Sequence, residues 1–252
     1  MRIERIQEKM NENLYQMMNN LIGTIDNKNS YEYNGNKVPR VTQIISKCIS
    51  SDGIAHWANS LGFKRLSYRK TLDAAANVGT IAHNNIDKFL IDNSHIMSTN
   101  VLDTPIQSQF AYQSFLKWYN DINSNANVEV LMHEETLVCK YFGGTLDGLY
   151  KINGKIYLVD YKTSNHVRYN YTLQLAAYRY MLRELLNIEI DGCIILQLSK
   201  SNIAYNEYVL NFDNPNELKY INDCEQAFMA MVYSYYNINK TENEYKLLQW
   251  GD

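Results

Sequence analysis

Hydrophobic residues in the first half of the chain recur with the spacing of amphipathic helices. In the first such stretch, residues 2–22, an apolar position returns every three or four residues, and most of the others are polar or charged. The chain holds only three prolines, so long helices are permitted. The pattern predicts helices over residues 2–22, 41–62, 66–93 and 105–123, with a loop near 93–104.

The second half of the chain has the pattern of strands. Segments rich in β-branched residues with partial alternation predict strands over residues 127–141, 142–152, 155–163, 191–200 and 203–212. The pair Asn153-Gly154 is a strong hairpin signal between two of them. Helical spacing returns over residues 169–187. A last helix is predicted to begin near Asp213, which is its expected N-cap, with Pro215 in the first turn.

The order of these elements predicts the fold class. Helices, three strands, a helix, two strands and a helix give a mixed α/β (α+β) fold, with a central mixed β-sheet flanked by helices. The helical N-terminal half is expected to pack against this sheet. We interpret residues 1–40 as an N-terminal helix and linker, with a turn at Asn34-Gly35, and residues 41–252 as the main domain.

Composition narrows the class of protein. With 46% hydrophobic and 20% charged residues, the chain resembles ordinary globular proteins. A formal net charge of −3 argues against coating nucleic acid by bulk electrostatics, so any DNA path must be local. The 21 tyrosines indicate either a coding bias or a surface on which bases stack.

Targeting and cysteine patterns indicate a soluble protein. No apolar run approaches the roughly 20 residues of a membrane span, and no signal peptide opens the chain. The four cysteines are scattered and include no CxxC pair, which argues against a zinc or thiol redox site. We therefore expect a protein of the cytoplasm (the host cytoplasm if it is viral) with no membrane partner.

The most informative block, residues 143–165, carries two aspartates and a lysine. Asp147 lies on the first strand of the predicted hairpin, and Asp160 lies 13 residues later on its partner. Lys162 leaves the strand on the same face as Asp160. Carboxylates that converge in this way hold a divalent cation, which neutralises a phosphodiester and supplies hydroxide near neutral pH. The lysine positions the attacking water or stabilises the developing charge.

An exposed pair of opposite charges at a strand end would look the same, and the Asp-Tyr-Lys triplet alone favours that interpretation. Gly143-Gly144-Thr145 before Asp147, the apolar run Ile156–Val159 and Thr163-Ser164 after the lysine favour a site instead. Tyr161 is expected to point the other way, into the core, with its backbone carbonyl within reach of a metal.

The block resembles the active-site hairpin of RecB-like nucleases of the PD-(D/E)xK superfamily, in which a G-T-x-D element precedes D-Y-K-T-S. Upstream, V-G-T-I-A-H at 78–83 resembles the helical G-T-x-x-H motif of that family. Downstream, Q-L-A-A-Y at 174–178 resembles its Q-x-x-x-Y motif. V-P-R-V-T-Q-I-I-S from residue 38, and the segment around Trp57, look like the phage and mitochondrial genome maintenance exonuclease branch.

The resemblance implies a restriction-endonuclease-like core and a Mg²⁺- or Mn²⁺-dependent deoxyribonuclease. Its implied metal ligands are His83, Asp147, Asp160 and the Tyr161 carbonyl. Gln174 and Tyr178 are implied to line the site and to contact DNA or the lysine, and their spacing puts them on one helix face. Relatives often carry a glutamate on the strand before the hairpin. Alternation lets only one of Glu134 and Glu135 face the site, and we favour Glu134.

Departures from the family limit what the resemblance implies. Asp87 stands where a glutamate often follows the motif histidine by four residues. The late cysteine cluster of the iron–sulfur relatives is missing, so we expect no iron–sulfur cluster. No G-x-x-x-x-G-K-[ST] motif occurs, so unwinding would need a helicase partner. Candidate DNA-binding residues are Lys64, Arg65, Arg69, Lys70, Arg168 and Arg179; a solvated helix face is an equal interpretation of the first four.

The expected function is an exonuclease on single-stranded or end-containing DNA, in viral or phage replication, recombination or genome processing. An endonuclease on the same fold and a non-catalytic binding module remain alternatives. Digestion polarity, the choice between DNA and RNA, the number of metals and the oligomeric state do not follow from the sequence.

Overall fold

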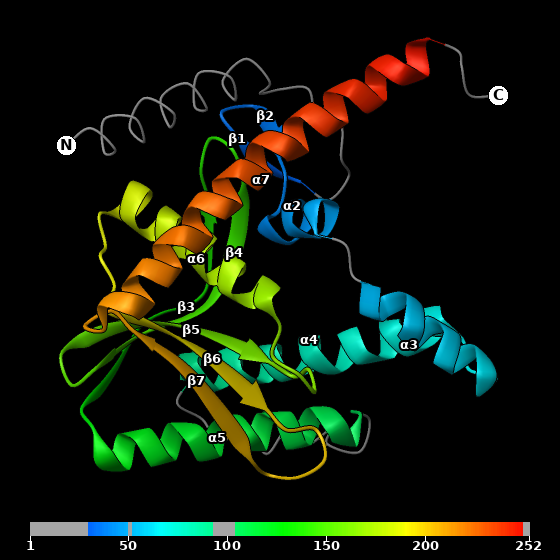
Figure 1. The fold of residues 1–252 in the computed structure, drawn as a ribbon. Helices are drawn as coiled ribbons and strands as arrows, with labels where there is room; N and C mark the ends of the chain where they lie inside the picture. The colour runs from blue at the N-terminus through cyan, green and yellow to red at the C-terminus, as the bar shows by residue number, and fades with distance from the viewer. Residues whose placement is uncertain (1–29, 50–51, 93–103, 249–252) are drawn as a thin grey trace.

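The computed structural model describes residues 30–49, 52–92 and 104–248. Its helices are α2 (Val41–Cys48), α3 (Asp52–Phe63), α4 (Tyr68–Asp92), α5 (Ile106–Asn125), α6 (Tyr169–Leu186) and α7 (Pro215–Leu247). Its strands are β1 (Tyr31–Tyr33), β2 (Asn36–Val38), β3 (Val128–Val138), β4 (Gly143–Ile152), β5 (Lys155–Lys162), β6 (Gly192–Leu198) and β7 (Tyr205–Asn211). The expected mixed α/β class with a central mixed sheet is confirmed (Figure 1).

The central sheet has the order β3-β4-β5-β6-β7. Strands β3, β4 and β5 form an antiparallel meander, whereas β5 and β6 are parallel and are joined through α6. β7 returns antiparallel to β6. The β4–β5 turn has positive φ at both Asn153 and Gly154, which matches the twist of a tight hairpin and explains the Asn-Gly pair. The predicted hairpin is therefore confirmed.

Helices cover both faces of this sheet and enclose two apolar cores. One core packs residues of α2, α6 and α7 against the sheet, with Phe142, Leu146 and Phe228 fully buried. The other packs α4 and α5 against the opposite face, around Phe115 and Trp118. Figure 1 shows α6 and α7 on one side of the strands and α4 and α5 on the other. A polar group at the end of a strand can therefore meet helices of both layers.

Three local predictions differ from the structure. The stretch expected to be one helix over residues 41–62 forms two helices, α2 and α3. The stretch interpreted as a linker forms the β1–β2 hairpin around the predicted Asn34-Gly35 turn, and the Tyr31 hydroxyl lies 3.1 Å from the Thr145 hydroxyl of β4. The N-cap of α7 is Asn214, not Asp213, because the Asn214 side chain accepts from the Asn216 amide. The predicted helix over residues 2–22 and the loop near 93–103 lie outside the described residues.

Two further observations bear on the class of protein. Across the described ranges, no helix is long and apolar enough to cross a membrane. The four cysteines are free thiols, three of them buried.

Candidate metal centre

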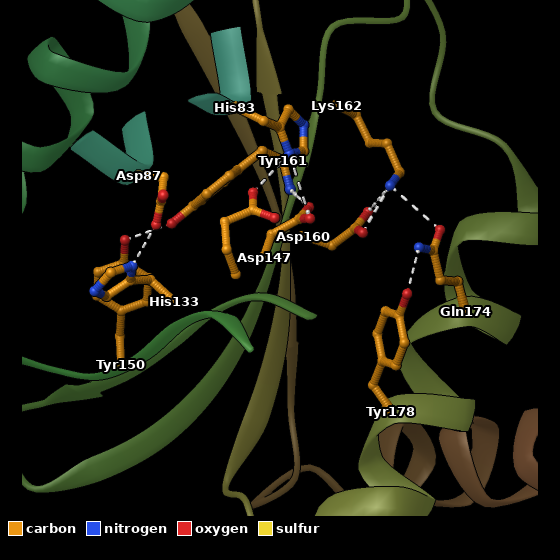
Figure 2. A network of polar contacts seen from close by, with 11 residues as sticks. His83, Asp87, His133, Asp147, Tyr150, Asp160, Tyr161, Lys162, Gln174 and Tyr178 are labelled. Carbon is orange, nitrogen blue, oxygen red and sulfur yellow. Dashed lines mark hydrogen bonds and ion pairs between the residues drawn. The ribbon is translucent and has the colours of Figure 1, made fainter. Parts of the chain in front are cut away.

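Three potential metal ligands from three different elements meet at one end of the sheet. His83 comes from α4, Glu134 from β3 and Asp147 from β4. His83 Nδ1 lies 3.2 Å from Glu134 Oε1 and 3.4 Å from Asp147 Oδ1. One ligand atom from each residue lies within 4.8 Å of those of the other two, and all three residues are partly or largely shielded from solvent. Figure 2 shows His83 and Asp147 pointing toward each other.

Glu134 reaches this cluster through an unusual backbone conformation. Its strand neighbours His133 and Glu135 pair with Gly148 and Leu146 of β4, which sets Glu134 opposite Asp147. Its φ of 45° lies in the left-handed region, which is uncommon for a residue other than glycine. Such strain persists only where the surroundings impose it, and it gathers at functional sites.

The strand β5 fixes the carboxylate of Asp147. The Tyr161 amide donates to Asp147 Oδ2 at 2.7 Å, which leaves Oδ1 for His83. The Tyr161 side chain points into the core, as expected: it is 1% exposed, and its hydroxyl bonds that of Tyr150 at 2.5 Å. A metal-ligand role for the Tyr161 carbonyl stays a prediction.

A second chain of contacts runs from β5 to α6. Lys162 Nζ lies 2.6 Å from Asp160 and donates to Gln174 Oε1 at 3.3 Å. Gln174 Nε2 in turn donates to the Tyr178 hydroxyl at 3.1 Å. The ammonium also lies 4.9 Å from the centre of the Tyr171 ring. The structure thus brings together the lysine and both residues of the Q-x-x-x-Y motif (Figure 2).

The placement of Asp160 differs from the expected ligand set. The three clustered ligand groups include Glu134 and leave out Asp160, which pairs with Lys162 instead. Asp160 is 2% exposed, and its Oδ2, although close to the ammonium, has no hydrogen bond within the described residues. A buried carboxylate oxygen of this kind retains a lone pair for a cation.

Several charged side chains lie close together at the site. Burial, assisted by the negative charge of Asp147, raises the pKa of Asp160 to about 7, although Lys162 opposes this shift. Burial lowers the pKa of His83, but Asp147 and Glu134 outweigh it and raise the value to about 10. Burial likewise lowers the pKa of Lys162, and Asp160 more than compensates, so the amine stays protonated at neutral pH.

These residues fit a divalent cation of the Mg²⁺ or Mn²⁺ class. They offer one imidazole nitrogen and two carboxylates at a common point, with a third, buried carboxylate in the neighbouring ion pair. A cation there would displace the proton from His83 and offset the repulsion among the carboxylates. The donor set contains no thiolate, so a soft metal is disfavoured.

The choice between Glu134 and Glu135 leads to a test. Glu134 Oε1 contacts His83, whereas Glu135 is exposed. We expect Glu134→Gln to weaken Mn²⁺ binding at least about tenfold, because one carboxylate ligand is lost. Glu135→Gln, one position away, should change it less than about twofold. Isothermal titration of both variants checks this, and equal affinities would remove Glu134 from the site.

The glycine before the first aspartate also has a physical reason. A Cβ added at Gly144 would lie 2.5 Å from Cε1 of Tyr178. Only glycine lets β4 approach the ring whose hydroxyl orients Gln174. The glycine of the G-T-x-D element thus supports the same contact chain that the Q-x-x-x-Y element forms.

The expected DNA-binding residues divide into two groups. Lys64, Arg65, Arg69 and Lys70 are exposed near the α3–α4 junction, and Arg168 is exposed at the start of α6. The surroundings of Arg179 contradict the prediction that this residue contacts DNA. It is 9% exposed, and its Nη1 donates to Asn222 and Glu225 of α7, so its charge stabilises the α6–α7 interface.

Removal of the Glu225 carboxylate from this interface should have a large effect on the free energy of unfolding. Glu225 pairs with both Arg179 and Arg183 and is largely buried. Glu225→Ala should lower the free energy of unfolding by about 3 kcal/mol, because it leaves the Arg179 guanidinium buried without a counter-charge. Asp223→Ala, which breaks an exposed pair with Lys219 on the same helix, should cost no more than about 0.5 kcal/mol. Urea unfolding compares the two, and similar losses would contradict a structural role for Arg179.

Sequence reasoning missed one pair beside the cluster. His133 Nδ1 lies 2.7 Å from Asp87 Oδ1, and Figure 2 shows the pair next to the metal ligands. Two signals were available: Asp87 follows His83 by four residues on α4, and His133 precedes Glu134 on β3.

Comparisons with known proteins add little to this geometry. No family model matches the chain, and no curated protein matches its sequence. A solved structure, described as the crystal structure of SSO0001, covers 88% of this chain and 88% of its own at 14% identity. Its TM-score of 0.33 is too low to support an argument about fold or function.

Proposed function

We propose that this protein is a metal-dependent deoxyribonuclease that uses Mg²⁺ or Mn²⁺. One observation carries the proposal. Residues from α4, β3, β4, β5 and α6, separated by up to 95 positions from His83 to Tyr178, meet as a ligand cluster and an adjoining, largely shielded lysine. If Asp160 and Lys162 were only an exposed pair of opposite charges at a strand end, they would need none of these partners.

Different side chains would have different roles in phosphodiester hydrolysis. A cation held by His83, Glu134 and Asp147 would supply charge neutralisation and an activated water. Lys162, kept protonated by Asp160, places a positive charge where negative charge develops in the transition state. Gln174 and Tyr178 hold the ammonium in position, so that no reorganisation is needed when the reaction occurs.

DNA as substrate and an exonuclease mode are supported by the sequence resemblance to the RecB-like and genome maintenance exonucleases. The proposal includes action on single-stranded or end-containing DNA in the cytoplasm, or in the host cytoplasm for a viral protein. A replication, recombination or helicase partner would supply unwinding, since the sequence has no nucleotide-binding G-x-x-x-x-G-K-[ST] motif.

Digestion of end-labelled nucleic acids tests the proposal. Single-stranded, double-stranded and closed circular DNA, with a single-stranded RNA of the same sequence, are incubated with Mg²⁺, Mn²⁺ or EDTA. We expect metal-dependent loss of linear DNA, survival of circles and no activity in Asp160→Ala. Nicked circles would instead indicate an endonuclease. No cleavage of any substrate with either metal would overturn the enzyme proposal and favour a binding role.

A further inference from the structure

A polar pocket of about 560 Å³ opens at the carboxyl ends of β5 and β6. This volume lies within the range of roughly 300–1,000 Å³ that is usual for small-ligand sites. Its walls come from the segment that follows β5, from β6, from the β6–β7 turn, from β7 and from the start of α5. Its lining includes Ser164, Gln197, Lys200, Tyr205 and Asn206.

One residue that lines the pocket, Gln197, is the strand neighbour of Lys162. Gln197 of β6 is the register partner of Lys162 in the parallel β5–β6 pair, so the two residues lie side by side. Gln197 Nε2 donates to the carbonyl of Ser164, two residues past the lysine, at 2.8 Å. Its Oε1 accepts from Asn206 Nδ2 at 3.1 Å. Ligands of α/β sheets bind outside the carboxyl ends of parallel strands, and this pocket lies at such an edge.

The lining chemistry favours an anionic, hydrogen-bonding ligand. It contains amide and hydroxyl side chains, one tyrosine and one ammonium, but no carboxylate, which argues against a cation. Lys200 is half-buried, and within the described part of the chain no acidic side chain pairs with it. Burial lowers the pKa of this amine, as expected where no counter-charge is near. An anion next to Lys200 would offset that cost.

We propose that this pocket binds one nucleotide of the substrate strand, adjacent to the phosphodiester at the metal centre, with Lys200 contacting a phosphate and the amide side chains contacting the base. The inference rests on the proposed nuclease function. Asn and Gln side chains match the donors and acceptors of base edges, and lysine binds phosphate as a point charge. A nucleotide combines both kinds of group.

Steady-state cleavage of single-stranded DNA by the full chain tests the pocket. Lys200→Ala should raise KM about tenfold, the loss of one charge-assisted hydrogen bond, and leave kcat within about twofold. Lys200→Arg should restore most of the affinity. The matched control is Lys219→Ala, an exposed lysine on α7 outside the pocket. Equal KM values for Lys200→Ala and Lys219→Ala would overturn the proposal and leave the nuclease assignment intact.

Binding without catalysis separates the two proposals. In EDTA, fluorescence anisotropy of a labelled oligodeoxynucleotide should show weaker binding by Lys200→Ala. The slope of log affinity against log salt should fall by about 0.7, the contribution of one phosphate contact on a single strand. If Lys200→Ala shows this weaker binding but the wild type cleaves no DNA, the nucleotide-binding role of the pocket is supported and the nuclease function is not. If only binding of free deoxyadenosine monophosphate depends on Lys200, the pocket serves a free nucleotide and the strand proposal is wrong.

Discussion

Replacing Lys162 with methionine should lower kcat for DNA cleavage by about 10³-fold without weakening Mn²⁺ binding. Methionine keeps the length of the side chain but removes the charge that faces the developing negative charge, and losses of 10²–10³ are typical for one such group. Metal affinity should hold or rise, because a positive charge near the cation has been removed. Cleavage rates and isothermal titration with Mn²⁺ measure the two effects separately.

A lysine on the same strand provides the control. Lys155 stands at the other end of β5, exposed and paired with Asp213. Lys155→Met should cleave DNA at the wild-type rate. Circular dichroism of both variants is needed, because Lys162→Met leaves the buried Asp160 carboxylate without its counter-charge and raises the pKa of that group further. A folded Lys162→Met protein with wild-type kcat would exclude a catalytic role for this lysine.

Asp147→Asn should remove both metal binding and cleavage. We expect Mn²⁺ affinity to fall at least about 100-fold and cleavage to fall by about 10³-fold. Asp147 contacts His83 through one oxygen and the Tyr161 amide through the other, so it links the cluster to β5. Asparagine keeps the shape but loses the charge that the cation requires.

Asp121 offers a matched carboxylate away from the site. It lies on α5, where it accepts from Lys117 and from the Tyr205 hydroxyl. Asp121→Asn should bind Mn²⁺ like the wild type in the same titration. Loss of cleavage in Asp147→Asn with unchanged Mn²⁺ affinity would show that the metal binds elsewhere, and equal loss in both variants would point to a general effect of carboxylate removal.

Much of the fold and part of the site followed from local sequence pattern. Strand alternation placed Asp160 and Lys162 on one face, and the structure brings them into contact. The four-residue spacing of Gln174 and Tyr178 placed them on one face of α6, where they form a hydrogen bond. These predictions succeeded because the interacting residues are close in sequence and the element imposes their geometry.

Features that depend on distant partners were not predictable in the same way. Glu134 has a left-handed backbone where β3 runs opposite β4, and nothing in the residues around it signals that conformation. Arg179 resembles an exposed cation next to a functional motif until α7 covers it with Glu225. The hairpin over residues 31–38 contacts β4, more than a hundred positions away. Because that contact leaves no signal in the local pattern, the segment resembles a linker in the sequence.

The same pair of parallel strands positions residues of the site and residues of the pocket. The parallel β5–β6 pair, connected by α6, brings the ends of both strands to the same edge of the sheet. β5 delivers Asp160 and Lys162 there, and β6 delivers Gln197 and the residues that follow it toward Lys200.

The proposed metal centre is tested most directly by the release of label from linear single-stranded DNA by the purified chain in Mn²⁺, before and after addition of EDTA. We expect steady release that stops with EDTA, that is lost in Asp147→Asn and Lys162→Met, and that persists in Asp121→Asn and Lys155→Met. Absence of release by the wild type, or equal release by all four variants, would contradict a nuclease centre at these residues.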